Sequence, residues 1–561
     1  EINVACESCH GPAAEHLKVL QEDSLSAENT GFALSSGARP NWALGEGDAI
    51  ARASSSASSG QGKEIDMCGG CHALRTVIGD VQPAGNFHDQ YRLNLLDNIS
   101  YFPDGQIREE VFVLGSFLQS KMHVKGVTCS NCHDPHSGQL VEEGNALCAQ
   151  CHRPEVFDAP GHHHHPPESA GAQCVNCHMP SRAFMVIDER RDHSFTIPRP
   201  DLSIALGVPN ACTGCHDDRA GDNSWALDVL KKWGYEPDDG HVAYLQARLG
   251  IPDILATRRA DEVLEDVGLA PIVRASLLAQ LAAIPSRLGA EQAAKNLSSP
   301  SPMVRRAAVQ ALRPFPAELR WKLLAPMLDD PGASVRYALA ETVLDIPRAI
   351  VAEKKNEVQR LLEEYRDMLN ASADAPGTQV ALANLAIRER DVAGAREAYE
   401  RALSIAPNYV PVLLSAAEFY RSTGDVKKEA EYLAHAVRID KGNAAALHSY
   451  GLHLVRKKMY ESALPYLQQS TSADGAVVRY AFVYAIALKE QGKLEQAIAV
   501  LEEADERWPN QYDILMTLVS LAEESGGEHA VGKYVSRLSQ IAPGSPEVKK
   551  LVQRYIESAR E

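Results

Sequence analysis

The hydrophobic positions of this 561-residue chain follow a helical pattern mainly in its second half. From about residue 259, small and aliphatic residues recur at the spacing of helix faces that pack on one another. Before residue 220 no such pattern is sustained, and Gly, Pro, Ser and Asn break the sequence repeatedly. The chain has no apolar run of the roughly 18 residues that a membrane-spanning helix needs. The pattern predicts a mostly α protein, loop-rich at first and then helical.

A repeat of 31 residues marks the first helical part. Three segments, 271–285, 302–316 and 333–347, can be aligned. Each carries a Val-Arg pair at the same place, namely Val273/Arg274, Val304/Arg305 and Val335/Arg336. This arrangement resembles HEAT repeats, whose second helix often opens with such a pair. A plain helical bundle is the alternative.

A second repeat, of 34 residues, begins near residue 378. One column of the repeat holds helix-breaking prolines, Pro407, Pro509 and Pro543. A second column holds the small residues Ala383, Ala417, Gly451 and Ala485. A third column holds Ala395, Ala463 and Ala497 and is interrupted by Glu429. The period and the small residues resemble tetratricopeptide repeats, TPR. Four or five helix pairs would stack into a superhelix whose concave face takes a peptide or protein. Alternatively, this solenoid only spaces or braces the first part of the chain.

All twelve cysteines belong to six Cys-x-x-Cys-His motifs in the first part of the chain. Numbered in chain order, motifs 1 to 6 are Cys6/Cys9/His10, Cys68/Cys71/His72, Cys129/Cys132/His133, Cys148/Cys151/His152, Cys174/Cys177/His178 and Cys212/Cys215/His216. Zinc would need four ligands at each site and would not explain a histidine directly after every second cysteine. A redox disulfide fits one such motif, not six. We therefore predict six covalent c-type haems, each bonded through two cysteine thioethers with the motif histidine as proximal iron ligand.

Net charge limits the possible partners of the protein, and covalent haem limits its cellular compartment. The formal net charge is −18 and the pI near 5.6, which makes a nucleic-acid partner improbable. Covalent haem is matured outside the bacterial cytoplasm, so we predict a periplasmic or extracellular protein. No signal peptide precedes Glu1, and we expect that the natural N-terminus has been removed or lies upstream.

A second ligand is needed on the other face of each iron. The candidates outside the motifs are His16, His88, His123, His136, one or two members of the run His162–His165 (with His163 and His164 as the named candidates) and His193. We expect His136 to reach a neighbouring iron. Met67, Met122, Met179 and Met185 could supply thioethers, but with histidines so plentiful we assign them to packing. Two axial imidazoles leave no position for a substrate and so favour electron transfer.

Five segments carry a wider resemblance: CESCHGPAAEH, FLQSKMHVKGVTCSNCHDPHSG, LCAQCHRPEVFDAPGHHHHPP, CVNCHMPSRAFMVIDERRDHSFTIPRPDL and VPNACTGCHDDR. Together they resemble the multihaem cytochromes of the nitrite reductase and hydroxylamine oxidoreductase superfamily, and among these the members fused to TPR. The resemblance implies His16, His123, His136, one of the His162–His165 run and His193 as second ligands. It also implies about two further haems on N-terminal sequence not present here. The CxxCK motif of the superfamily's reductases is absent, which weakens an enzymatic interpretation.

Four parts are predicted: a cytochrome domain (1–220), a helical connector (221–258), HEAT-like repeats (259–365) and TPR (366–561). The predicted function is electron transfer through a chain of mostly bis-histidine haems, with the solenoid docking redox protein partners or further subunits. Two alternatives stay open. One is a subunit of an extracellular conductive filament, which would make the chain a polymer. The other is an oxidoreductase that acts on a small nitrogen or sulfur oxyanion at a five-coordinate haem.

Overall fold

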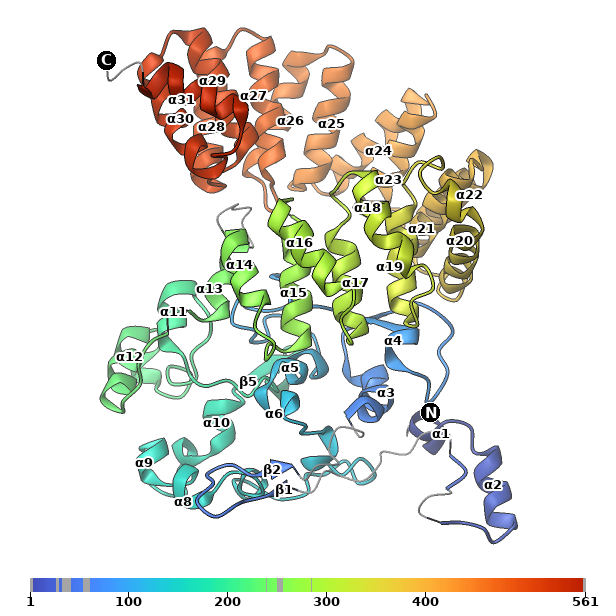
Figure 1. Cartoon of the computed structure of the whole chain (residues 1–561), viewed down its shortest axis with the longest axis vertical. Helices are drawn as coiled ribbons and strands as arrows, with labels where there is room; N and C mark the ends of the chain where they lie inside the picture. Colours follow the sequence, from blue (N-terminus) through green and yellow to red (C-terminus); the bar gives the residue numbers. More distant parts are fainter. Residues whose placement is uncertain are drawn as a thin grey trace. The chain divides into compact units, whose positions relative to one another are not determined.

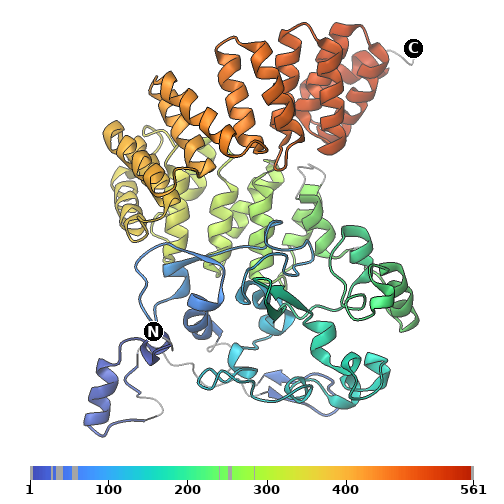
Figure 2. The same cartoon turned by 180° about the vertical axis from the view of Figure 1, so that it is seen from behind.

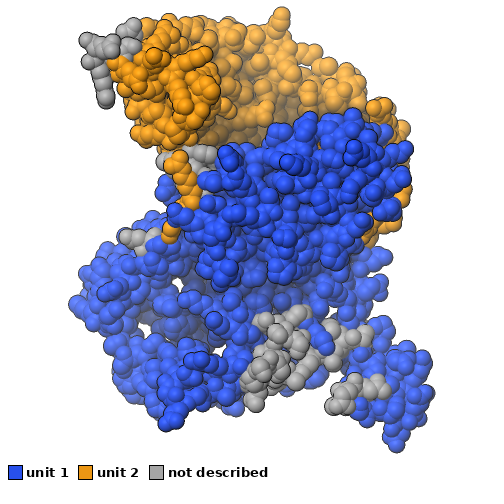
Figure 3. Space-filling view, in the orientation of Figure 1, with its two compact units in different colours: residues 1–250, 260–343, 347–361 blue, residues 251–259, 344–346, 362–561 orange. Residues whose placement is uncertain are grey.

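The computed structural model describes residues 4–26, 30–32, 42–53, 61–238, 240–249, 256–283 and 285–557. The chain forms two compact units, shown in different colours in Figure 3. The first unit comprises residues 1–250, 260–343 and 347–361, and the second comprises residues 251–259, 344–346 and 362–561. All six motifs lie in the first unit.

Short helices and turns make up the part of the first unit that carries the motifs (Figure 1). The helices are α1 (Cys6–His10), α2 (Ala14–Gln21), α3 (Gln61–His72), α4 (Phe87–Gln90), α5 (Leu114–Gln119), α6 (Lys121–Val124), η2 (Cys129–Asn131), α7 (Ala146–Ala149), α8 (Pro154–Phe157), α9 (Pro160–His163), η3 (Ala170–Ala172), α10 (Cys174–His178), α11 (Pro200–Leu206) and η4 (Asp217–Arg219). Gly11 ends α1 and Gly207 ends α11, both with positive φ, since glycine adopts such a backbone without strain.

The described strands pair only as antiparallel two-stranded hairpins. They are β1 (Trp42–Ala43) with β2 (Arg52–Ala53), β3 (Arg75–Val77) with β4 (Tyr91–Leu93), and β5 (Ser181–Phe184) with β6 (Asp188–Arg191). In the β3–β4 hairpin Arg75 lies opposite Leu93. This hairpin follows motif 2 directly and holds the chain near it.

Longer helices and two short 3-10 helices complete the first unit. They are α12 (Asn223–Lys232), α13 (Val242–Leu249), α14 (Ala256–Leu264), α15 (Pro271–Leu281), α16 (Arg287–Asn296), α17 (Pro302–Ala311), α18 (Ala317–Leu324), η5 (Ala325–Met327), α19 (Ala333–Val343) and η6 (Ala352–Lys354); α14 and α20 (Lys355–Asn370) each include residues of both units. Helices α15, α17 and α19 lie side by side in Figures 1 and 2.

The 31-residue repeat has a physical cause in these three helices. The valine of each Val-Arg pair is buried, whereas the arginine donates to main-chain carbonyl oxygens of the turn before its helix. The bonded carbonyls are those of Leu264 and Asp266 for Arg274, Ser299 and Pro300 for Arg305, and Asp330 and Pro331 for Arg336. The arginine thus satisfies carbonyl groups that a turn leaves unpaired.

The same helices pack on the motif-bearing part of the unit. The main-chain N–H of Leu96 donates to Ser276 Oγ at 2.9 Å, and Arg306 Nη2 donates to the Leu93 carbonyl at 2.9 Å. The N–H of Ala333 donates to Asp89 Oδ1 at 2.8 Å. One helix after another therefore contacts residues 89–96, so α15, α17 and α19 brace the segment that follows motif 2.

The second unit is a row of antiparallel helix pairs, stacked in chain order in Figures 1 and 2. After α20 come α21 (Pro376–Glu389), α22 (Val392–Ile405), α23 (Val410–Ser422), α24 (Val426–Ile439), α25 (Ala444–Arg456), α26 (Tyr460–Ser472), α27 (Val478–Glu490), α28 (Leu494–Arg507), α29 (Tyr512–Ser525), α30 (Glu528–Ile541), α31 (Pro546–Val552) and the π-helix η7 (Gln553–Glu557). The predicted mostly α fold class is confirmed.

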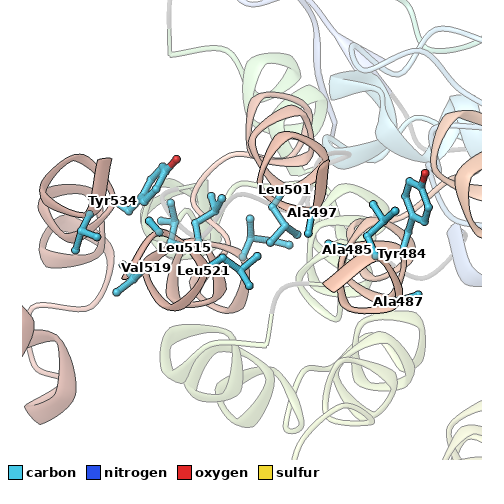
Figure 4. Close-up of a cluster of buried hydrophobic side chains, with 14 of the residues drawn as sticks. Tyr484, Ala485, Ala487, Ala497, Leu501, Leu515, Val519, Leu521 and Tyr534 are labelled. Carbon is cyan, nitrogen blue, oxygen red and sulfur yellow. The ribbon is translucent and has the colours of Figure 1, made fainter. Parts of the chain in front are cut away.

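Small residues allow close approach between paired helices in this unit. Ala383, Ala417 and Ala485 are at most 1 % exposed. A Cβ on Gly451 would lie 2.6 Å from Leu467 Cδ2, which explains the glycine in that column. Figure 4 shows how Leu501 and Leu515 fill the space between neighbouring helices of the same stack.

Glu429 breaks the alanine column because it forms a buried polar cluster. It is 3 % exposed and accepts a hydrogen bond from Arg456 Nη2 at 2.5 Å. His453 Nδ1 lies 3.2 Å from its other carboxylate oxygen. Both partners lie on α25, so the interruption of the column records an ionic contact between α24 and α25.

Candidate haem-binding sites

Each motif folds as one helical turn. Motifs 1, 2 and 5 lie in α1, α3 and α10, and in motifs 3, 4 and 6 the histidine N–H donates to the carbonyl of the first cysteine at 2.9 to 3.0 Å. Residues i, i+3 and i+4 share one face of a helical turn. Both thiols and the imidazole therefore point to one side, as a doubly attached porphyrin with a proximal histidine requires.

The motifs adjoin one another in chain order. Thiols of each consecutive pair of motifs interact, as hydrogen bonds or through space: Cys9 with Cys68 and Cys71, Cys68 with Cys129, Cys132 with Cys151, Cys148 with Cys174, and Cys177 with Cys212 and Cys215. Main-chain and side-chain bonds support two of these junctions. Glu64 of α3 accepts from the Ser130 N–H at 3.1 Å, and Asn145 accepts from the Cys174 N–H at 3.0 Å. The attachment points thus form one continuous series.

The pKa of several cysteine thiols is shifted, in most cases upward by burial. Burial raises the pKa of Cys132 to about 11, with a smaller contribution from Cys151. A hydrogen bond from Cys148 lowers the pKa of Cys174 to about 7, whereas the same bond and burial raise that of Cys148. A thioether carries no charge, so attachment to a porphyrin suits partly buried sulfurs such as that of Cys132 better than a thiolate does. Within the described ranges, no group of three or more His, Cys, Asp or Glu side chains is arranged to hold a metal ion.

Four motif histidines face a second imidazole that lies outside the motifs. The ring centroids of these pairs are 6.1 to 6.3 Å apart, with interplanar angles of 15° to 43°. The pairs are His10 with His136, His133 with His193, His178 with His162, and His216 with His165. Each joins residues from separate segments of the chain.

This spacing fits one iron between two imidazoles. A nitrogen–metal bond of about 2 Å and a further distance of about 1 Å from that nitrogen to the ring centre, counted on both sides, give about 6 Å between centroids. Rings in ordinary stacking contact can approach much more closely, as His16 and Phe32 do at 4.2 Å. The residues present therefore fit bis-histidine haem at motifs 1, 3, 5 and 6.

The orientation of several rings leaves Nε2 available to a metal. Nδ1 lies against a main-chain carbonyl oxygen in His178, His193, His165 and His16, at 2.9, 3.0, 2.5 and 2.5 Å respectively. A carbonyl only accepts, so Nδ1 carries the proton and Nε2 keeps its lone pair. Metal-binding histidines are commonly held by this contact.

In the four-histidine run, the outer two members face motif histidines. His162 faces motif 5 and His165 faces motif 6. His164 has a left-handed backbone (φ 57°) after the end of α9, and its ring stacks on Trp233 at 4.2 Å. His163 Nδ1 accepts from the His165 N–H at 3.1 Å. Of the sequence candidates, His163 and His164 therefore contact the run itself and Trp233.

Three further candidates belong to none of these four pairs. His16 stacks on Phe32, and the ring of His123 lies 5.1 Å from that of Phe117. Burial lowers the pKa of His123. His88 lies near Arg306, and burial, with this arginine, lowers its pKa to about 4.

Motifs 2 and 4 differ from the other four. In the part of the chain that the structure describes, neither His72 nor His152 shows a facing imidazole ring. His72 interacts electrostatically with His133 and His193, so motif 2 lies close to the motif 3 pair. The ring of Phe157 meets His152 edge-on at 5.3 Å and meets His162 edge-on at 5.4 Å.

Sequence reasoning missed the aromatic residues that frame the sites. Trp225 of α12 lies 5.0 Å from the ring of His216, and Trp233, at the end of the same helix, contacts His164 and His165. The connector helix therefore forms part of the motif 6 site. The signal was a pair of tryptophans, Trp225 and Trp233, in the segment predicted as a helical connector.

Two family models match parts of the chain. Residues 122–157, which contain motifs 3 and 4, match the doubled CXXCH motif. Residues 380–444 and 451–512 match the tetratricopeptide repeat. The first match supports covalently bound c-type haem and electron transfer, and the second supports interaction with a protein or peptide.

Several solved structures are similar to part of this chain at low sequence identity. MamA is 20 % identical over 29 % of this chain and 95 % of its own, with a TM-score of 0.26. YrrB, described as a TPR protein with an unusual peptide-binding site, is 18 % identical over 32 % of this chain and 93 % of its own (TM-score 0.26). PilF of Pseudomonas aeruginosa is 17 % identical over 39 % of this chain and 96 % of its own (TM-score 0.29).

No helix of the described residues is both long and apolar enough to cross a membrane.

Proposed function

We propose that this chain transfers electrons through six c-type haems, one bonded to each motif, and that motifs 1, 3, 5 and 6 carry two axial histidines. The observation that carries this proposal is the set of four imidazole pairs at 6.1 to 6.3 Å. Iron held between two imidazoles changes oxidation state without gaining or losing a ligand. His136, His193, His162 and His165 are the second ligands in this proposal.

The ligand-bearing segments favour rapid transfer between neighbouring haems. His133 and His136 lie in one short turn, in which the His136 N–H donates to Asp134 Oδ1 at 3.1 Å. His133 serves motif 3 and His136 serves motif 1. In the same way, His162 and His165 serve motifs 5 and 6. One segment of four residues thus links the irons of motifs 1 and 3, and another links those of motifs 5 and 6. The thiol contacts link each motif to the next along the chain.

Motifs 2 and 4 support a second candidate function. An iron held by His72 or His152 alone would offer its sixth position to a small ligand such as a nitrogen or sulfur oxyanion. The other haems would then supply or remove electrons. His16, His88 and His123 remain proposed second ligands for these irons. Ligation by one of them would close the sixth position of that iron, so ligation distinguishes the two candidate functions.

The helical repeats and the compartment complete the proposal. We assign α15 to α19 to HEAT-like repeats that brace residues 89–96, and the concave face of the TPR unit to a redox protein partner or a second copy of the chain. The motifs and the order of the repeats support membership of the nitrite reductase and hydroxylamine oxidoreductase superfamily and a periplasmic or extracellular location. Assembly into a conductive filament would use the same TPR unit.

Electron paramagnetic resonance of the oxidised protein tests the proposal. Spin quantitation should give at least four low-spin haems with bis-histidine character. Cyanide or nitrite should change the spectrum of at most two haems, and no change at all would exclude the second candidate. A majority of high-spin haem would contradict the proposal.

A further inference from the structure

A buried carboxylate lies at the junction of motifs 2 and 3. Glu64 of α3 is 5 % exposed, and Ser130 of motif 3 is 8 % exposed. The Ser130 N–H donates to one carboxylate oxygen of Glu64 at 3.1 Å, and the Ser130 hydroxyl donates to the other at 2.5 Å. Both oxygens of Glu64 are therefore bonded to the helical turn of motif 3.

Glu64 lies on the face of α3 that also carries the first cysteine of motif 2. It precedes Cys68 by four residues, and residues i and i+4 share one face of a helix. The Glu64 carboxylate interacts electrostatically with the thiols of Cys68 and Cys129, the first cysteines of motifs 2 and 3. These two thiols also form a hydrogen bond with each other. The carboxylate is thus placed where the attachment points of two haems meet.

No cation offsets this carboxylate within the described part of the chain. Glu64 forms no ion pair there, and its hydrogen bonds come from Ser130. A buried carboxylate is normally paired with a cation, because removal of a charge from water is costly. A glutamine could join the two turns without that cost, since its amide can accept from the Ser130 N–H and donate to the Ser130 hydroxyl. The charge of Glu64 therefore indicates a role beyond holding the two turns together.

We propose that Glu64 is a charge-tuning residue that lowers the reduction potentials of the haems attached at motifs 2 and 3. This inference rests on the proposed covalent haems at those motifs. An oxidised iron–porphyrin core with imidazole ligands carries one net positive charge, and one electron from a neighbouring haem or a redox partner removes it. A carboxylate in a site of low dielectric constant stabilises the positive state more than the neutral one. The reduced haems of motifs 2 and 3 are then stronger electron donors to their neighbours.

Spectroelectrochemical titration of the haem-loaded full chain tests this role. Glu64→Gln keeps the shape of the side chain and removes its charge, so two haems should shift to more positive midpoint potentials. Ser130→Ala removes the hydroxyl bond but keeps the charge, so no haem should shift to a more positive potential. Glu291→Gln is the matched control, because it removes an equal charge from an exposed pair with Arg287. This control should leave all potentials unchanged.

The remaining outcomes separate the possible failures. Fully loaded Glu64→Gln protein with wild-type potentials would overturn the charge-tuning role alone. An equal positive shift in Ser130→Ala would overturn it in favour of a purely structural contact between the two turns. Glu64→Met also removes the charge, should give the same positive shift, and provides the test if Glu64→Gln does not fold. A polypeptide mass without attached haem would instead overturn the proposed function.

Discussion

Replacing His136 by alanine tests the pairing of imidazoles at motif 1. The ring of His136 lies 6.1 Å from that of His10, and we assign both to one iron. An alanine methyl group cannot ligate, so this iron should keep His10 alone and become high-spin. With six motifs in the chain, the expected change is one sixth of the haem iron. His136 is exposed in the polypeptide, so the fold should be unaffected.

The assay is spin quantitation of oxidised protein by electron paramagnetic resonance, with and without added imidazole. Compared with the wild-type protein, His136→Ala should gain a high-spin signal equal to one haem in six, and added imidazole should remove this gain. His164→Ala is the matched control, because His164 is also exposed but stacks on Trp233. A gain of high-spin haem in the control relative to the wild-type protein, or no gain in His136→Ala, would refute the ring-pair reasoning.

Three further predictions concern stability, each measured by urea or thermal unfolding. Leu515→Ala should destabilise the second unit by about 3 kcal/mol, because Leu515 is fully buried and a cavity would remain; no loss would mean that this core is not closely packed. His448 is 6 % exposed and burial, with Arg479, lowers its pKa to about 4. Because the unfolded chain binds a proton there near pH 6.5, stability should fall by up to about 3 kcal/mol as the pH drops from 6.5 to 4, and His448→Phe should flatten this slope. Asp330→Asn should cost about 3 kcal/mol, because Asp330 is buried and Arg305, whose side chain is 12 % exposed, would lose its carboxylate partner. Glu291→Gln at an exposed pair should cost less than about 0.5 kcal/mol; equal costs would contradict the role of burial.

The elements with a local cause could be predicted from the sequence. A CxxCH motif places its three functional groups on one helical turn, and the 34-residue period records how closely paired helices approach. Even the exception was visible, since Glu429 interrupts a column of alanines. Its reason was not visible, because His453 and Arg456 lie on the next helix and share no pattern with it.

The pairing of histidines could not be derived from spacing. His10 and His136 come from distant segments, as do His133 and His193, and no periodicity links them. Within the run His162–His165 the residues are identical, so composition cannot choose among them. The end of α9 and the left-handed turn at His164 decide which rings face motifs 5 and 6. Until ligation is measured, these second ligands stay predictions.

The contact between the helical repeats and residues 89–96 could not be predicted from the sequence either. The Val-Arg pairs predict the helices, and their arginines serve only the turns before them. Arg306, which follows the pair Val304/Arg305, donates a hydrogen bond to the main-chain carbonyl of Leu93, more than 200 residues earlier. Such long-range contacts follow from the fold and leave no local signal.

The mass of the intact, denatured chain tests the central claim most directly. Thioether bonds survive denaturation and acid-acetone extraction, whereas non-covalent haem is lost. The account predicts the polypeptide mass of 61.0 kDa plus six haem groups, with peptides that carry haem at every motif. A mass equal to the polypeptide alone, with colourless protein after extraction, would contradict it.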